Sequence, residues 1–377
     1  MPQFVAVTSN GLTDVLADEV ASLGFKVIEK NRSGVTFESN WEGCYRANLE
    51  LRTATRILKP VLDFPAYNGD DLYHNLQKHD FTKYIRVNQT LAVDAAVRDS
   101  SLRDQRFVAM KAKDAIVDQF REKFGSRPDV DTSRPDLRVM VRVVKSQVNV
   151  AIDTSGEALS YRGYRTQSGE APLREHLAAG LLALSGWQED VALIDPMCGS
   201  GTILIEAAMR ARKIAPGSHR KRFAFQNFLA FQPDVWDRVV TETLSHELAG
   251  ATLHLYGFDR SSKMVQIAQN NAVRAGVDAE IRFATSAVDI LTAPADCEPG
   301  VLIVNPPYGE RMGVTEELKD VYRDLAFSLK RNFKNWTCWI LSGNETLTGA
   351  LKLKARRRMP VFNGNIECRF LEYKINA

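Results

Sequence analysis

One short stretch limits the folds open to this chain more than any other. Four apolar residues, Val301–Val304, predict a strand that is fully buried. Asn305 follows at its tip, and Pro306 and Pro307 then end the strand because neither can continue a ladder or a helix. The pattern predicts a rigid turn that presents the Asn305 amide, the Pro306 carbonyl and the Tyr308 ring side by side.

These three groups suit the exocyclic amine of a nucleobase. An amide oxygen and a carbonyl can accept both amine protons, and an aromatic ring can stack on the base. Acceptors that hold the protons favour a pyramidal nitrogen whose lone pair points at an electrophile. The alternative is an ordinary buried strand that ends in a Pro-Pro turn, with Tyr308 as packing, and the four residues alone leave both interpretations open.

Strands and helices alternate along the C-terminal part of the chain. Such alternation predicts a mainly parallel sheet, with an antiparallel edge at the end. Helices are expected at 170–184, 203–212, 261–275 and 316–333. The expected strands are 191–194, 253–258, 280–284, 301–304, 336–341 and 366–375.

The first of these strands leads into a loop with two glycines, Asp195-Pro-Met-Cys-Gly-Ser-Gly. Gly199 and Gly201 let a ligand approach the backbone closely, and Asp195 can accept from an ammonium group. A nicotinamide site is the competing interpretation, but the loop lacks the third glycine of that motif and begins with an acid. At the end of the second strand, Asp259 can accept from ribose hydroxyls, cap the next helix, or do both.

The N-terminal third predicts two further α/β units. Residues 3–64 follow the order βαββαβ of a ferredoxin-like unit, with its second helix at 41–58. Residues 66–155 carry a strand at 91–97, a hairpin of Leu137–Val144 and Gln147–Asp153, and a helix at 106–124. Five cations near the start of that helix suit RNA phosphates or a solvated helix face: Arg98, Arg103, Arg106, Lys111 and Lys113. The apolar residues of that helix expected to point inward are Phe107, Met110, Val117, Phe120 and Phe124.

Several of these motifs resemble known families. Asp114-Ala-Ile-Val-Asp-Gln-Phe, Arg134-Pro-Asp-Leu-Arg-Val and Arg162-Gly-Tyr-Arg resemble the THUMP module, an RNA-binding domain of RNA-modifying enzymes. The glycine loop, Gly257-Phe-Asp and Asn305-Pro-Pro-Tyr resemble class I methyltransferases that use S-adenosyl-L-methionine (AdoMet). From residue 1 to residue 377 the chain is similar to the THUMP-domain ribosomal RNA guanine-N2 methyltransferases. Some members carry a second methyltransferase module, so the chain is either a standalone form or part of a longer one.

The resemblance implies an architecture and an activity. It implies a ferredoxin-like unit at 1–65, a THUMP domain at 66–160 and a Rossmann-like methyltransferase domain at 161–377 with a mainly parallel seven-stranded sheet. The expected reaction is methyl transfer from AdoMet to the N2 amine of a guanine in large-subunit ribosomal RNA. The Gly309-Glu310-Arg311 extension and the RNA domain favour guanine over adenine N6. Two further interpretations stay open, namely guanine-N2 methylation of tRNA and a non-catalytic RNA-binding assembly factor.

The resemblance also implies roles for particular residues. The family pattern places an acid for the AdoMet adenine where Ala287 stands, and Asp289 lies two residues further on. The expected catalytic residues are Asn305, Pro306, Pro307 and Tyr308. The expected AdoMet-binding residues are Asp195, Pro196, Met197, Cys198, Gly199, Gly201, Asp259, Asp289 and Asn305.

An insert at 213–250 mixes cations with aromatic residues, including Phe223, Phe225, Phe228 and Trp236. This composition suits single-stranded RNA, whereas the alternative is a solvated loop whose rings pack onto the domain. No histidine or cysteine is placed as a nucleophile, and His176 and His219 are expected to contact RNA or solvent. The residues expected to contact RNA are Arg98, Arg103, Arg106, Lys111, Arg162, Arg165, Arg220, Lys221, Arg222 and Arg356.

Composition narrows the remaining possibilities. A chain of 377 residues holds two or three domains, and its formal net charge of +3 means that RNA must be held by local basic patches. The five cysteines are scattered and never spaced Cys-x-x-Cys, which favours reduced thiols and argues against a zinc cluster. There is no signal-peptide pattern and no membrane-spanning stretch. A cytoplasmic protein is expected, with no metal, no membrane contact and no readable protein partner.

Overall fold

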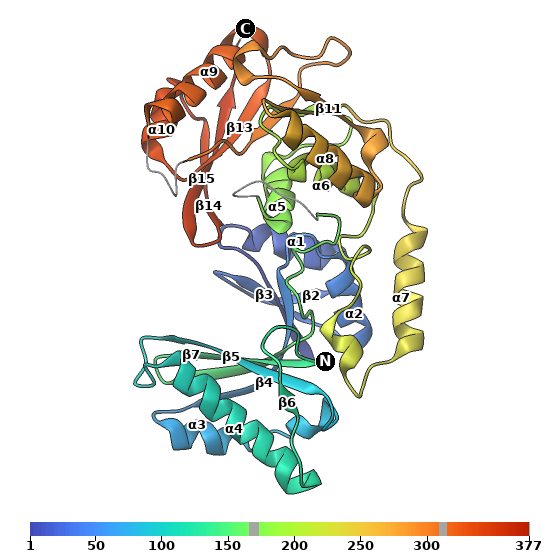
Figure 1. Cartoon of the computed structure of the whole chain (residues 1–377), viewed down its shortest axis with the longest axis vertical. Helices are drawn as coiled ribbons and strands as arrows, with labels where there is room; N and C mark the ends of the chain where they lie inside the picture. Colours follow the sequence, from blue (N-terminus) through green and yellow to red (C-terminus); the bar gives the residue numbers. More distant parts are fainter. Residues whose placement is uncertain (166–172, 309–314, 377) are drawn as a thin grey trace.

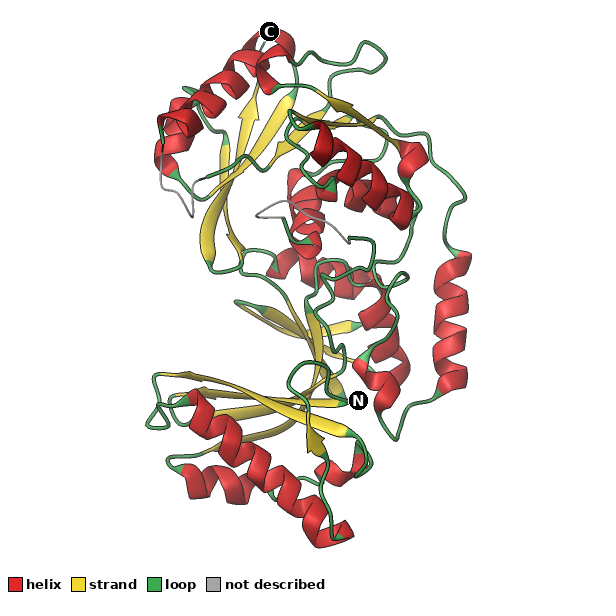
Figure 2. Ribbon diagram, viewed as in Figure 1, coloured by secondary structure: helices red, strands yellow, loops and turns green. Residues whose placement is uncertain are grey.

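The computed structural model describes residues 1–165, 173–308 and 315–376. Two sheets organise these residues, one of eight strands and one of seven. The eight-stranded sheet occupies the lower part of the molecule in Figure 1, and the seven-stranded sheet occupies the upper part. Helices pack against both sheets (Figure 2). The predicted α/β class is confirmed.

The N-terminal unit runs from β1 (Gln3–Val7) to β4 (Arg56–Pro65) and has the expected βαββαβ order. One prediction about it is wrong, because the second helix ends at Glu50 and not at residue 58. The amide of Thr55 donates to the Val7 carbonyl, and β4 then pairs with β1. Strand pairing and β-branched side chains therefore override the helical pattern there. The other elements are α1 (Thr13–Ser22), β2 (Lys26–Asn31), β3 (Gly34–Glu38) and α2 (Trp41–Glu50).

The second unit runs from α3 (Gly69–Leu76) to β8 (Gln147–Asp153) and shares its sheet with the N-terminal unit. Strand β4 pairs with β1 on one side and with β8 on the other. Both units therefore lie on one continuous sheet, in the order β2-β3-β1-β4-β8-β7-β5-β6. The remaining elements are β5 (Thr90–Arg98), α4 (Gln105–Phe124), β6 (Asp129–Val130) and β7 (Leu137–Val144).

Helix α4 shows a different buried face from the one expected. Val117 and Phe120 point inward as predicted, but Phe107, Met110 and Phe124 are 45%, 62% and 49% exposed. Phe107 lies on the side of the helix opposite Ile116, and Phe124 is the last residue of the helix. The buried residues are Val108, Ala112, Ala115, Ile116, Val117 and Phe120.

The C-terminal unit runs from α5 (Glu175–Ser185) to β15 (Ile366–Lys374) around the predicted seven-stranded sheet. Its strand order is β11-β10-β9-β12-β13-β15-β14, parallel as far as β13 and antiparallel at the last two pairings. Strand β14 was not predicted. The elements are β9 (Leu193–Asp195), α6 (Thr202–Ala211), β10 (Leu255–Asp259), α8 (Ser262–Ala275), β11 (Ile281–Thr285), β12 (Val301–Val304), α9 (Glu316–Asn332), β13 (Thr337–Ser342), α10 (Glu345–Ala350) and β14 (Arg357–Asn363).

Successive residues of the central strands enter two different cores. In β9, Leu193 belongs to one core and Ile194 to the other. In β12, Ile303 lies in the first core, whereas Leu302 and Val304 lie in the second. This alternation is the two-residue period of a strand, so the apolar run at 301–304 is explained by burial on both faces.

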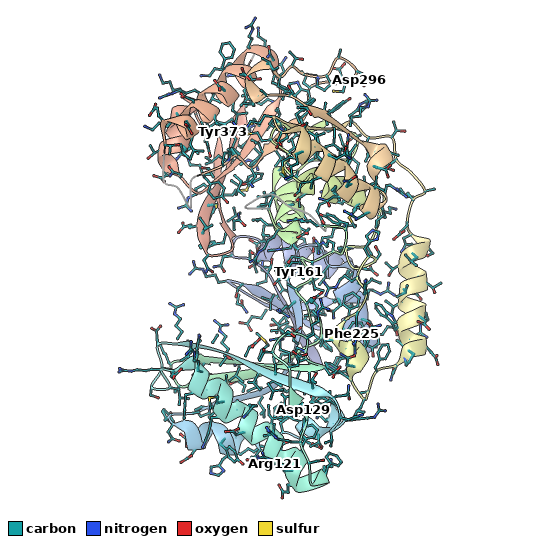
Figure 3. All side chains as sticks on the ribbon, viewed as in Figure 1. Arg121, Asp129, Tyr161, Phe225, Asp296 and Tyr373 are labelled. Atoms are coloured by element: carbon teal, nitrogen blue, oxygen red, sulfur yellow. The ribbon has the colours of Figure 1, made fainter. Side chains whose placement is uncertain are left out.

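The insert packs onto the N-terminal unit. Phe223, Phe225 and Phe228 are at most 5% exposed and belong to the same core as the N-terminal and second units. The Phe225 ring lies 4.5 Å from the Tyr45 ring, centroid to centroid, beside α2 (Figure 3). These aromatic rings therefore pack in the core, which is one of the two interpretations of the sequence. The other, that they stack on RNA, is wrong. Two helical elements form here, η2 (Ala224–Asn227) and α7 (Pro233–Ser245).

Across the described part of the chain, no helix combines the length and apolar character needed to cross a bilayer.

Candidate active site

Three polar side chains stand at the carboxyl ends of adjacent parallel strands. Asp195 ends β9, Asp259 ends β10, and Asn305 directly follows β12. Strand β9 lies between the other two and pairs in parallel with both. The three side chains therefore share one edge of the sheet, which is where open α/β sheets bind ligands.

The Asp195 carboxyl is buried, and no cation of the described residues pairs with it. Its side chain is 2% exposed, and its Oδ1 accepts from the Met197 amide at 3.1 Å. Burial, with a smaller contribution from the charge of Asp259, raises the pKa of Asp195 to about 8. A buried carboxyl of this kind gains most from a cation that approaches it, because the cation offsets the cost of desolvation.

The loop after β9 is held open by its glycines and tied to β10. Gly199 and Gly201 have φ angles of +53° and +82°, in the region that side chains disfavour. A Cβ on Gly201 would lie 3.0 Å from the Cβ of Ala268, whereas no atom of residues 1–165, 173–308 or 315–376 lies within 4 Å of a Cβ on Gly199. The loop therefore leaves room beside Gly199 for a ligand to approach the backbone.

Asp259 fixes the geometry of this loop. Its Oδ2 accepts from the Gly199 amide at 3.0 Å, and its Oδ1 accepts from the Ser261 amide at 2.9 Å. The N-cap of α8 is Ser261, whose hydroxyl accepts from the Met264 amide, so the expected capping role passes to Ser261. The Cys198 amide also donates to the Phe258 carbonyl at 2.8 Å. These bonds hold the glycine loop against the tip of β10.

The Asn305 side chain carries a buried acceptor that no group in the described part of the chain satisfies. Among the described residues, no group donates to its Oδ1. Leaving such an atom without a donor costs on the order of 1–3 kcal/mol, so it points to a donor supplied by a ligand. Pro306 is buried, Pro307 is exposed and Tyr308 is half-buried.

The other residues expected at the cofactor occupy different positions. Pro196 and Cys198 are buried and Met197 is half-buried within the loop after β9. Asp289 is exposed in the short turn η4 (Val288–Ile290), which follows β11 at the edge of the sheet. Its contact with the adenine stays a prediction, as does the alternative that backbone alone holds this ring. Gly309-Glu310-Arg311 lie outside the described residues.

Six of the residues expected to contact RNA are exposed, and several have acidic neighbours. Arg98 pairs with Asp99 at 3.2 Å, and the half-buried Lys111 pairs with Asp70 at 3.3 Å. These acids weaken the positive field at the start of α4. The six exposed residues are Arg98, Arg103, Arg106, Lys221, Arg222 and Arg356.

Three predicted RNA contacts are placed differently. Arg162 is 1% exposed and forms an ion pair with Glu206, so its side chain does not reach the surface. Arg165 pairs with Glu175 at 3.1 Å. Arg220 donates to three backbone carbonyls between residues 157 and 161. The guanidinium groups of Arg162 and Arg220 hold the chain around residue 160, and the prediction for Arg162 is corrected.

His176 also differs from expectation. It is 2% exposed, and its Nε2 lies 2.8 Å from the hydroxyl of Ser9 in the N-terminal unit. Burial lowers the pKa of His176 to about 3, so the ring is neutral. It joins the two units and does not face solvent. Within the described residues, no three His, Cys, Asp or Glu side chains gather as a metal site requires.

Sequence reasoning missed one residue that touches the site. The Asn363 Nδ2 donates to the Tyr308 hydroxyl at 2.6 Å, although the two residues are 55 positions apart. Asn363 ends β14, which turns into β15 through Gly364 at φ +66°. The Asn-Gly-Asn sequence at 363–365 was the available signal, because such pairs mark tight hairpins.

Three family models match the chain. They are the RlmL ferredoxin-like domain at residues 3–58, the THUMP domain at 66–153, and the RMKL-like methyltransferase domain at 162–372. The last covers more than half of the chain. A curated relative from Syntrophotalea carbinolica, named ribosomal RNA large subunit methyltransferase K/L, is 37% identical over 99% of this chain and 53% of its own length. The chain thus spans about half the length of the curated relatives it matches.

Two solved structures are similar over the whole chain. A possible methylase from Clostridium difficile 630 has a TM-score of 0.90 and 30% identity, covering 100% of this chain and 98% of its own. The structure of SMU.472 in complex with SAH has a TM-score of 0.88 and 29% identity, with the same coverage. The arrangement of all three units is therefore shared with these proteins.

Proposed function

The chain belongs to the family of RMKL-like methyltransferases, and from this premise we propose that it methylates the N2 amine of a guanine in large-subunit ribosomal RNA. The observation that carries the proposal is the buried Oδ1 of Asn305, an acceptor without a donor among the described residues. It lies at the tip of β12, next to the strand that ends in Asp195. An amine brought there would satisfy an atom that the described residues leave unsatisfied.

AdoMet fits the rest of this edge of the sheet. Asp195 would accept from its ammonium group, Asp259 from its ribose hydroxyls, and the loop at Gly199 would lie against it. When bound, AdoMet supplies an electrophilic methyl carbon on a sulfonium. SMU.472, which shares the fold over the whole chain, was solved with SAH, and this supports the assignment. The roles of Pro196, Met197, Cys198, Gly201 and Asp289 are part of the same proposal.

The chain's own residues activate the amine by position. The Asn305 Oδ1 and the Pro306 carbonyl accept its two protons, which localises the nitrogen lone pair and directs it away from the base. Tyr308 stacks on the base and fixes its plane, and Pro307 stiffens the turn between them. No strong base is needed, because the nitrogen sheds a proton after transfer. Positioning alone supplies on the order of 7–11 kcal/mol in such reactions.

The eight-stranded sheet would bring the RNA to this site. Its second half matches the THUMP domain, and a base has to leave its stack before the turn at 305–308 can hold it. Shape and phosphate contacts suit folded RNA, and the exposed cations Arg103, Arg106, Lys221 and Arg356 are the proposed contacts. A division at residues 65 and 160 is proposed for the three domains.

The identity of the methylated nucleoside tests this proposal. The chain would be incubated with labelled AdoMet and large-subunit RNA, either naked or partly assembled, and the RNA then digested for mass spectrometry. We expect label in N2-methylguanosine, and none with the Asn305→Ala variant. Label in N6-methyladenosine, or label only when tRNA is supplied, would overturn the guanine or the ribosomal assignment. AdoMet binding without any transfer would favour a non-catalytic assembly factor.

A further inference from the structure

Tyr308 is held at its hydroxyl by a residue from the outermost strand of the sheet, β14. The Asn363 Nδ2 donates to the Tyr308 hydroxyl oxygen at 2.6 Å, and both side chains are half-buried. A ring that must meet an incoming base in one orientation benefits from a fixed tip, because ordering the ring in advance removes that cost from binding.

The Tyr308 ring is also confined at its Cδ2 edge, which faces Gly343. Gly343, between β13 and α10, leaves space for it, since a Cβ there would lie 3.4 Å from the Tyr308 Cδ2 and 3.2 Å from the Ile366 Cγ2. The ring packs against apolar residues of both cores of the C-terminal unit. With its side fixed by packing and its tip by Asn363, the ring has little freedom to turn.

Asn363 is in turn fixed by the N-terminal unit. The amide of the preceding residue, Phe362, donates to the Asn10 carbonyl at 3.2 Å. Gly11, at φ +92°, lies so close to β14 that a Cβ there would overlap the Pro360 carbonyl oxygen. The Arg32 guanidinium lies 5.9 Å from the Phe362 ring centroid. In Figure 1 the end of β14 accordingly reaches the blue N-terminal elements.

We propose that Asn363 is a positioning residue that fixes the Tyr308 ring for stacking on the target base, and that the N-terminal unit holds Asn363 through β14. The inference rests on the proposed function, because it assigns the ring a base to stack on. It gives the N-terminal unit a part in the geometry of the active site, whereas its fold alone carries no chemistry. Two hydrogen bonds therefore link the loop after β1 to the turn after β12. They join Asn10 to Phe362, and Asn363 to Tyr308.

A double-mutant cycle tests the inference. Asn363→Leu keeps the side-chain volume and removes the donor, and Tyr308→Phe keeps the ring and removes the acceptor. Each should lower kcat/KM for RNA methylation about two- to tenfold, the usual effect of one hydrogen bond. The double variant should lose no more than the larger single effect, because both changes remove the same bond. Losses that multiply would overturn the inference.

Two controls separate the possible failures. Glu367→Ala alters the same hairpin at an exposed side chain that pairs with Arg369, and should leave kcat/KM unchanged. The KM for AdoMet should stay constant throughout, because Asn363 is proposed to act on the base.

The contact can also be followed by NMR, independently of any activity assay. The probe is the side-chain amide signal of Asn363 in selectively 15N-labelled protein. This signal should shift in Tyr308→Phe, and an unshifted signal would overturn the inference. If the signal shifts in Tyr308→Phe but the wild-type chain does not methylate RNA, the proposed function is overturned and the contact still stands.

Discussion

Arg162 and Glu206 form an ion pair in which both side chains are almost completely buried. The Arg162 Nε lies 3.2 Å from the Glu206 Oε1, and their exposed fractions are 1% and 0%. Arg162 also donates to the Leu159 carbonyl at 2.8 Å, and the Tyr164 hydroxyl donates to Glu206 at 3.2 Å. The pair connects the segment after β8 to helix α6, next to the boundary between the parts of the chain that match the THUMP and methyltransferase models.

Breaking this pair from one side should destabilise the chain strongly. Arg162→Met would leave the buried Glu206 carboxylate without its ion-pair partner, at a cost of about 3–5 kcal/mol in the free energy of unfolding. Chemical denaturation measures the loss. Arg134→Ala is the matched control, since Arg134 and Glu157 are 81% and 58% exposed and their pair contributes at most about 1 kcal/mol. Equal losses in both variants would contradict this account of residue 162.

Binding of AdoMet should depend on pH through Asp195. Burial raises the pKa of this carboxyl to about 8, so below that pH it holds a proton that an ammonium ligand must displace. Affinity should therefore rise about tenfold from pH 6 to pH 7, a range in which α-amino groups stay protonated.

Titration calorimetry in buffers of different ionisation enthalpy measures both the affinity and the released proton. Asp195→Asn should bind more weakly and lose the pH dependence, because no carboxyl remains to titrate. The same raised pKa means that the ligand-free protein loses stability as pH rises from about 4 to 8, and Asp195→Asn should remove that slope too. A wild-type affinity that is flat with pH would contradict the assignment of Asp195.

Asn305 should control turnover and not cofactor affinity. Asn305→Ala removes the buried acceptor, so methyl transfer should fall by at least about a hundredfold, as when other positioned transition-state hydrogen bonds are lost. AdoMet binding should change little. Asn305→Asp is the matched variant, because it keeps an acceptor oxygen at nearly the same place and should retain part of the activity. Single-turnover assays at saturating AdoMet measure this, and near-normal turnover of Asn305→Ala would contradict the proposed mechanism.

Local patterns were enough to predict much of the fold. The apolar run at Val301–Val304 and the hairpin of Leu137–Val144 and Gln147–Asp153 have the bounds that the sequence indicates. Their limits are set by prolines or by two-residue alternation, which act within a few positions. The strand tips at Asp195 and Asp259 could be placed for the same reason, since each ends a buried run.

Contacts between distant segments could not be predicted in this way. Arg162 looks like a surface cation in sequence and is buried only because Glu206 faces it from α6. Phe107 looks like a core residue, yet the stripe of α4 that packs on the sheet passes it by. Asn363 had no visible role until the antiparallel hairpin brought it to Tyr308. Each depends on a partner more than 40 residues away or on the orientation of a whole helix.

The insert at 213–250 offers a direct contrast between packing and RNA contact. Phe225 is 1% exposed and lies among the rings of Tyr45, Phe223 and Trp236, so Phe225→Ala should cost about 3–5 kcal/mol in the free energy of unfolding. Lys221 is exposed, so Lys221→Ala should leave stability within about 0.5 kcal/mol.

For RNA binding, the two variants should rank in the opposite order, with Lys221→Ala the more impaired. Lys221→Ala should weaken binding. It should also reduce the slope of log Kd against log salt concentration by about one, because one cation that contacts a phosphate is lost. Phe225→Ala, measured at a temperature where it remains folded, should bind RNA as the wild type does. A stable Phe225→Ala protein that fails to bind RNA would mean that this ring leaves the core to stack on a base, against the burial that the fold imposes on it.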